Sequence, residues 1–182
     1  MMTTLPSGED DLGLRRRAAQ GDELAFEALI GPLADPAFRL ALTMLRDRGE
    51  AEDAVQEATL RAWRKIHQAR DDRPLRAWFL AITANHCRSV LRGGWRSRVR
   101  LGTPERVHAG ADERAISGHD LARGLARLST DERAAIYLFF YLGLPLEEVA
   151  SVLDLSVSAA RSRVYRAARR LRPALELDEV VR

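Results

Sequence analysis

Cysteine is nearly absent from this sequence, which holds only Cys87. A single cysteine excludes an intrachain disulfide. It also argues against a cysteine-based zinc site, because such sites need several ligands. The chain lacks any run of about 18 apolar residues, so we expect no membrane span. Residues 1–11 are polar and acidic and hold no apolar signal-peptide core, so we expect a cytoplasmic protein.

Lysine is scarce as well, since Lys65 is the only lysine among 29 basic residues and the rest are arginine. A GC-rich genome is a sufficient cause of that bias, so the placement of the arginines is the better evidence. The net charge is only +3, yet residues 73–104 hold seven arginines and no acid, and residues 155–175 repeat the pattern. Acids gather instead at residues 9–11 and 50–57. Two basic surfaces and one acidic surface predict polyanion contacts at two places.

Strand signals are weak along the whole chain, whereas apolar residues recur at the three- and four-residue steps typical of helices. We therefore predict an all-α protein with two small helical domains joined by a flexible linker that is poor in apolar residues. The expected units are a disordered N-terminus at 1–14, a first domain at 15–95, the linker at 96–118, a second domain at 119–177 and a tail at 178–182. Helices of the first domain are expected at 23–30, 37–45, 50–66 and 75–91, the last ended by Gly93 and Gly94.

Residues 146–171 predict a helix, a tight turn and a second helix. Apolar residues recur at helical spacing up to Leu153, and Asp154 follows where the chain must turn, since aspartate tolerates a left-handed backbone. Ser156 stands where an N-cap belongs, and the helix after it carries many arginines. This layout places a recognition helix in the major groove of DNA. The alternative is a helical hairpin with a solvated arginine face.

A second signal lies in the first domain, where residues 49–63 read GEAEDAVQEATLRAW. This string resembles region 2.2 of the sigma factors of bacterial RNA polymerase, above all the extracytoplasmic-function (ECF) group, whose pattern is close to DAEDLVQETFLRAW. Residues 73–85, RPLRAWFLAITAN, resemble regions 2.3 and 2.4 of that group, and residues 128–171 resemble its region 4. The resemblance spans about residues 21–172 and keeps the order of the family's motifs.

The resemblance implies binding to core RNA polymerase, through its β and β′ subunits. In the family, the region 2.2 helix docks on the coiled coil of β′. The matching polar positions here are Glu52, Asp53, Gln56 and Glu57. An acidic, hydrogen-bonding face suits an arginine-rich partner helix. The alternative is an ordinary solvated helix face.

The resemblance also implies that the first domain reads the minus-10 promoter element as a single strand, with a base extruded into a pocket. Asn85 matches a family position that contacts this element, and its amide offers a donor and acceptors to a base edge. Arginines along the same segment would guide the strand electrostatically. The expected minus-10 residues are Arg73, Asn85, Arg88 and Arg92.

The positions that match the family's minus-35 contacts lie on the arginine-rich helix. Arginine reads guanine edges or clamps phosphate, and both roles stay open for these side chains. Serines at the start of the helix meet phosphates through backbone N–H groups and the helix dipole. The expected minus-35 residues are Ser156, Ser158, Arg161, Ser162, Tyr165 and Arg166.

These observations predict a transcription initiation factor that binds core polymerase and directs it to promoters. We expect no catalysis, cofactor or metal, because the sequence assembles no nucleophile–base pair, phosphate loop or metal cluster. The family further implies control by an anti-sigma factor. One alternative is a stand-alone helix-turn-helix regulator that binds duplex DNA as a dimer, although no dimerisation heptad is visible. Another is an adaptor that binds only proteins.

Overall fold

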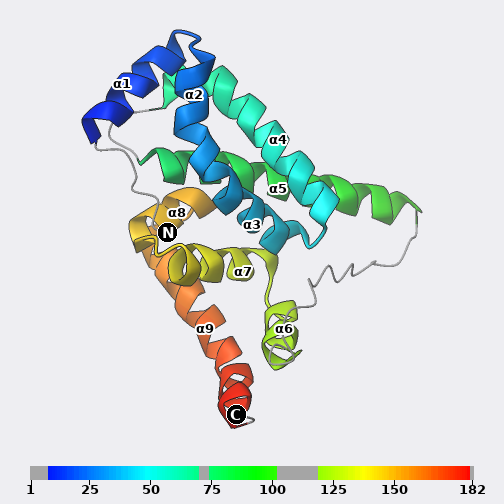
Figure 1. The fold of residues 1–182 in the computed structure, drawn as a ribbon. Helices are drawn as coiled ribbons and strands as arrows, with labels where there is room; N and C mark the ends of the chain where they lie inside the picture. Colours follow the sequence, from blue (N-terminus) through cyan, green and yellow to red (C-terminus); the bar gives the residue numbers. More distant parts are fainter. Residues whose placement is uncertain (1–7, 70–73, 102–118, 181–182) are drawn as a thin grey trace.

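The computed structural model describes the backbone of residues 8–69, 74–101 and 119–180, and the side chains of residues 11–69, 74–93 and 123–172. The described residues are helical, as predicted, and form two halves along the chain (Figure 1). The first half holds α1 (Gly8–Ala19), α2 (Glu23–Ile30), α3 (Ala34–Leu45), α4 (Arg48–Lys65) and α5 (Leu75–Leu101), with short 3-10 turns at Gly31–Leu33 and Ile66–Gln68. The second half holds α6 (His119–Ala126), α7 (Thr130–Ile136), a π-helical turn (Tyr137–Tyr141), α8 (Leu146–Leu153) and α9 (Val157–Val180).

Small residues on α4 build the core of the first half. Ala51, Ala54, Ala58 and Ala62 recur at steps of three and four and are fully buried. Their small side chains let α3 and α5 pack closely against α4, so this stripe faces the core. Two aspartate caps fix where the neighbouring helices start. The side chain of Asp22 accepts the N–H of Ala25 before α2, and that of Asp47 accepts the N–H of Glu50 before α4.

Helices α3 and α4 begin two or three residues before their predicted starts, at Ala34 and Arg48, and two boundaries differ by more. Residues 8–14 belong to helix α1 rather than to a disordered end, and α1 packs on α2 with Ala18 buried and Arg15 paired to Asp11 at 2.7 Å. Helix α5 continues to Leu101, past the two glycines at which we expected it to end. A glycine costs a helix about 1 kcal/mol relative to alanine, but it keeps the backbone hydrogen bonds and therefore does not have to stop the helix. Residues 102–118 of the predicted linker lie outside the described residues.

The second half contains the predicted helix-turn-helix. Asp154 ends α8 in the left-handed conformation, with φ 55° and ψ 54°, and its backbone N–H bonds the carbonyl of Ala150. Ser156 then caps α9 by accepting the N–H of Ala159 at 3.2 Å. The turn residue and the cap were both expected from the sequence, because aspartate and serine offer these local hydrogen bonds.

The N-terminus of α7 carries a complete capping box. Ser129 and Glu132 bond each other's backbone N–H groups, and the Glu132 carboxylate also accepts from Arg170 of α9 at 3.0 Å. Burial opposes the ionisation of Glu132, but the bonds from Ser129 and the charge of Arg170 outweigh it and hold the pKa of Glu132 below its usual value. The carboxylate therefore ties α7 to α9 within the second half.

Replacing Glu132 with glutamine is expected to destabilise the second half at neutral pH by about 1–2 kcal/mol, since the charge-assisted bonds are lost. A carboxylate whose native pKa is lowered adds stability above its unfolded pKa and loses it as the pH falls through the native pKa. The difference between wild type and E132Q should therefore shrink below about pH 4. Urea unfolding at a series of pH values measures it, and a difference that persists undiminished into strong acid would contradict the assignment.

The two halves pack against each other and share one apolar core. Helix α8 lies against α5, and α7 with the π-helical turn lies against α3 (Figure 1). Leu138, Leu144 and Val149 of the second half are buried in the same cluster as Leu40 and Phe79 of the first. We call this contact, of α7, the π-helical turn and α8 with α3 and α5, the interdomain seam. The sequence predicted two tethered domains and gave no sign of it.

Among the residues that the structure describes, the stretch Glu23–Leu45 is long and apolar enough to cross a membrane. The stretch is divided among α2, a 3-10 turn and α3, and its apolar residues Phe26, Leu40 and Met44 lie in the core. Burial of a core helix accounts for its apolar composition.

Candidate polymerase and DNA interfaces

The candidate polymerase face lies on α4, opposite the buried alanines. Glu52, Asp53 and Gln56 are exposed there, and Glu57 is half-buried. Glu52 accepts a hydrogen bond from Arg48 at 3.0 Å. Within the part of the chain that the structure describes, the side chains of Asp53 and Gln56 form no hydrogen bond or ion pair. These two groups are therefore available to a partner without breaking an internal contact.

An ion pair at the edge of this face keeps one of its carboxylates ionised. Arg61 donates to Glu57 at 2.7 Å, and this bond lowers the pKa of Glu57, which therefore stays ionised at neutral pH. The charges of Glu57 and Arg61 both act on the ring of His86 on α5. Burial, and then the charge of Arg61, lower the pKa of His86, so its ring is neutral at pH 7. The face thus presents carboxylates without a competing histidine charge.

Leu60 extends the same face and was missed in the sequence analysis. Its side chain is 51% exposed, one helical turn beyond Gln56. The signal was present in the sequence, since Leu60 lies off the alanine stripe of α4. An exposed leucine beside available polar groups offers an apolar contact at the centre of a polar surface.

The six candidate minus-35 residues are all exposed on α9 or at its cap. Val164 and Ala167 face the core from the same helix, which turns the candidate side chains outward. The hydroxyls of Ser156 and Ser158 lie 3.1 Å apart at the N-terminus of α9, where the helix dipole favours a phosphate. Tyr165 is 53% exposed. These side chains are therefore accessible on the outside of the second half.

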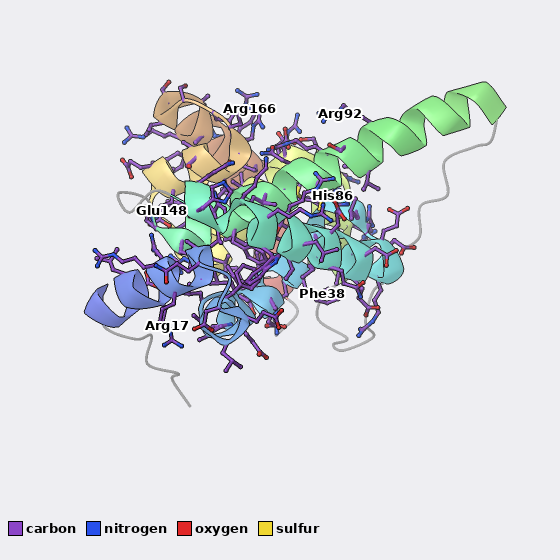
Figure 2. All side chains as sticks on the ribbon, turned by 90° about the horizontal axis from the view of Figure 1, so that it is seen from above. Arg17, Phe38, His86, Arg92, Glu148 and Arg166 are labelled. Atoms are coloured by element: carbon purple, nitrogen blue, oxygen red, sulfur yellow. The ribbon has the colours of Figure 1, made fainter. Side chains whose placement is uncertain are left out.

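Three of the candidate minus-10 residues, Asn85, Arg88 and Arg92, lie along α5, and only part of that set is accessible. Asn85 and Arg92 are exposed, and Arg92 donates to Ser89 at 3.2 Å. The Arg88 side chain is only 18% exposed. Arg73 lies outside the described residues. Figure 2 shows Arg92 of α5 and Arg166 of α9 toward the same edge of the molecule, away from Arg17 and Phe38.

Arg88 is covered because it is bonded across the interdomain seam. Its guanidinium donates to the carboxylate of Asp131 at 3.3 Å, to the carbonyl of Leu153 at 3.0 Å and to the Asn85 side chain at 2.9 Å. Asp131 and Leu153 belong to the second half. No sequence pattern indicates that Arg88 and Asp131, 43 residues apart, are partners.

No three His, Cys, Asp or Glu side chains lie close enough to hold a metal ion among the residues that the structure describes. Cys87 of α5 is fully buried in the apolar core that the two halves share, and burial raises the pKa of its thiol to about 12. The residue therefore acts as a small apolar side chain.

The thiol of Cys87 is expected to resist alkylation in the native protein. At pH 8 its thiolate fraction is smaller than that of an ordinary cysteine by about three orders of magnitude, and the core excludes the reagent. Iodoacetamide labelling followed by mass spectrometry measures this, with the urea-unfolded chain as the positive control. Native labelling at the unfolded rate would show that the core opens around α5.

Comparison with known proteins defines the class of this chain. Residues 29–97 match the family model "Sigma-70 region 2", and residues 119–171 match "Sigma-70, region 4". These are the two halves described above, in the order found in sigma-70 factors.

Individual relatives narrow the class. The chain is 33% identical to the ECF RNA polymerase sigma factor SigC of Mycobacterium tuberculosis over 194 residues, which cover 99% of both chains. Its fold is similar to that of the sigma factor RpoE solved with the anti-sigma factor NepR from Bartonella quintana, with a TM-score of 0.72, 27% identity and coverage of 84% of this chain and 98% of that one. It is also similar to CnrH, solved with the cytosolic domain of CnrY, with a TM-score of 0.68, 30% identity and coverage of 93% and 99%. The chain belongs to the ECF family of RNA polymerase sigma factors.

Membership establishes what the protein does. It is an ECF sigma factor that directs promoter-specific initiation by RNA polymerase, and it is not an enzyme. The predicted family, fold class and function are thereby confirmed.

Proposed function

We propose a division of labour among three helices of this sigma factor. The exposed face of α4, centred on Asp53 and Gln56, binds the β′ subunit of core polymerase. The outer face of α9 holds the minus-35 duplex, with Arg161 and Arg166 as its principal contacts. Helix α5 captures the melted minus-10 strand through Asn85 and the neighbouring Arg88 and Arg92.

The observation that carries this proposal is the contrast between the two faces of α9. Every candidate minus-35 residue is exposed, whereas Ala160, Val164 and Ala167 between them are fully buried. A helix that buries its apolar face and exposes a row of arginine, serine and tyrosine side chains suits a DNA groove. The candidate residues on α4 support the polymerase contact in the same way.

Gel filtration of the purified chain with bacterial core polymerase, followed by sequencing of run-off transcripts from genomic DNA, tests the proposal. We expect co-elution and transcription starts that share a two-part promoter. Free binding to duplex operators without any association with core polymerase would instead favour a stand-alone helix-turn-helix regulator.

We also propose that an anti-sigma factor controls this protein and that both act in the cytoplasm, where polymerase meets promoter DNA. The support is the similarity to RpoE and CnrH, each solved with such a protein or its cytosolic domain. Affinity purification of the tagged chain from its own bacterium tests this, and we expect one small protein to elute with it in stoichiometric amount.

A further inference from the structure

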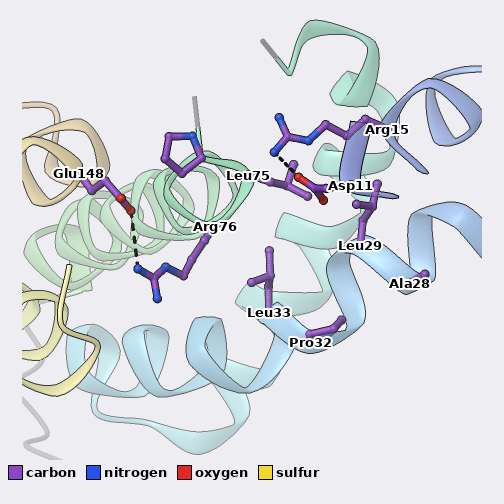
Figure 3. A pocket seen from close by; sticks show the side chains of 10 residues that line it. Asp11, Arg15, Ala28, Leu29, Pro32, Leu33, Leu75, Arg76 and Glu148 are labelled. Carbon is purple, nitrogen blue, oxygen red and sulfur yellow. Dashed lines mark hydrogen bonds and ion pairs between the residues drawn. The ribbon is translucent and has the colours of Figure 1, made fainter. Parts of the chain in front are cut away.

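A cavity of about 330 Å³ lies where α1, α2, α5 and α8 meet (Figure 3). Small-molecule sites in proteins have volumes of about 300–1,000 Å³, so this cavity has room for a small ligand. Among the residues that the structure describes, none of those proposed to bind polymerase or DNA lines the cavity. The proposed function therefore does not use it.

The inner wall of the cavity is apolar. It contains Leu29 of α2, Leu33 of the 3-10 turn after α2, and Leu75 at the start of α5. Their exposed fractions are 6%, 8% and 7%, and all three belong to the main apolar core. The core holds these side chains in place, so the wall does not have to form when a ligand arrives. A flat apolar ring gains free energy when it leaves water for such a wall.

Two ion pairs of different quality flank the cavity. Arg15 donates to Asp11 at 2.7 Å, which is the length of a strong charge-assisted hydrogen bond. Arg76 of α5 and Glu148 of α8 lie 3.8 Å apart, which is too long for a hydrogen bond. Figure 3 shows the two pairs on opposite sides of the cavity. Two arginines and two acids line it, so the charged groups sum to zero and favour a neutral ligand.

The loose pair leaves both of its members short of hydrogen bonds. Oε2 of Glu148 is buried and accepts no hydrogen bond from the residues that the structure describes. Within the same part of the chain, the guanidinium of Arg76 donates no hydrogen bond, although it carries five N–H groups. A buried carboxylate oxygen without a donor is unfavourable. A ligand that brings both a donor and an acceptor to this end of the cavity would satisfy both groups.

An amide group meets both needs at once. Its N–H and its C=O are attached to one carbon atom, so the N–H can donate to Glu148 while the oxygen accepts from Arg76. The last torsion of a glutamate side chain is soft, and its rotation turns a carboxylate oxygen toward the cavity. A ligand carboxylate in the same place would be repelled by Glu148, and a ligand ammonium would be repelled by Arg76.

We propose that this cavity is a binding site for a small neutral aromatic amide. The ring of the ligand packs on Leu29, Leu33 and Leu75, and its amide group lies between Arg76 and Glu148. The inference does not depend on the proposed polymerase and DNA contacts, because the described residues that make them lie outside the cavity. Failure of either proposal therefore leaves the other standing.

Three ligands with the same ring and different charges test the proposal. At pH 7 benzamide is neutral, benzoate is anionic and benzylamine is cationic. Binding to the full-length chain is measured from carbon-13 spectra of its leucine methyl groups, in which the signals of Leu29, Leu33 and Leu75 should shift. Leu128 and Leu171 belong to a separate apolar cluster and are the internal control.

We expect saturable binding of benzamide, with a dissociation constant on the order of 1 mM for a ligand of this size. Benzoate and benzylamine should bind at least about fivefold more weakly, because each leaves one member of the loose pair without a partner. Equal affinities for the three ligands would show that the amide is not recognised. Benzamide shifts that never saturate, or that are as large at the control leucines, would exclude the cavity as the site.

Two variants should change which ligand is preferred. Glu148→Gln removes the negative charge beside Arg76, so benzoate should become the tightest ligand. Arg76→Gln removes the positive charge, so benzylamine should. The matched controls Glu147→Gln and Arg64→Gln alter exposed residues that do not line the cavity, and both should keep the preference for benzamide.

Circular dichroism checks that each variant is folded. If either cavity variant is unfolded, the comparison of the three ligands on the wild-type chain still decides the outcome. Folded cavity variants that keep the wild-type order of affinities would overturn the assignment of Arg76 and Glu148 as the groups that bind the amide.

Discussion

Replacing Asp53 with arginine and Gln56 with alanine in one variant is expected to weaken binding to core polymerase about a hundredfold. Both side chains are exposed on α4, and neither forms a side-chain bond within the described part of the chain, so the fold does not depend on them. In a complex with an arginine-rich helix, the new arginine would meet like charges in place of a carboxylate. Loss of one partner of an interfacial charge pair costs about 2–5 kcal/mol, which corresponds to this loss of affinity.

The measurement is a fluorescence titration of labelled sigma factor with core polymerase. Glu27→Arg on α2 is the matched control, since Glu27 is also exposed and its replacement changes the charge by the same amount. The melting temperature of both variants should stay close to that of wild type. Unchanged affinity in the α4 variant would remove this face from the polymerase interface.

Replacing Arg161 and Arg166 with alanine in one variant is expected to reduce the affinity of the holoenzyme for its promoter about 30-fold or more. Each arginine contributes about 1–3 kcal/mol of binding free energy if it reads a guanine. If it binds phosphate instead, its loss should weaken binding equally for all DNA sequences. The slope of the logarithm of the binding constant against the logarithm of salt concentration separates the two roles. Each lost phosphate contact should reduce that slope by about one unit, whereas loss of a base contact should relax the preference at one promoter position.

Promoters mapped by transcript sequencing supply the templates, and holoenzyme binding is titrated at several salt concentrations. The matched control is the double variant Arg16→Ala/Arg127→Ala. Both arginines are exposed and lie off the recognition helix, and their replacement removes the same charge. The control should lose little affinity. A recognition-helix variant with wild-type promoter preference and salt slope would place the minus-35 contacts elsewhere.

Local chemistry explains why most of the helices could be predicted. Asp22, Asp47 and Ser129 cap helices because their side chains reach backbone N–H groups two or three residues on, and this needs no tertiary contact. The buried alanines of α4 repeat at the helical period. The largest departures from the predicted boundaries are the end of α5 and the helix α1. In α5, backbone hydrogen bonds continue the helix through two glycines that disfavour it. In α1, the local sequence leaves a helix open, and packing on α2 favours it.

The candidate site was predicted unevenly for the same reason. Exposure on α9 follows from the helical period, so the candidate minus-35 residues could be placed outward from the sequence. The surroundings of Arg88 could not, because its partners Asp131 and Leu153 are 43 and 65 residues away. A sequence pattern identifies a cation suited to DNA and does not reveal that an internal carboxylate already holds it.

The sequence by itself determined the helices, their caps, the helix-turn-helix and the resemblance to ECF sigma factors, because each depends on residues a few positions apart. The tertiary structure alone decided how the two halves meet. The contact of Arg133 with Thr43 joins residues 90 positions apart, and that of Tyr137 with Pro36 joins residues 101 positions apart. Their formation depends on the packing of complete helices, which no local periodicity encodes. The accessibility of the DNA-binding arginines is therefore a property of the packed molecule.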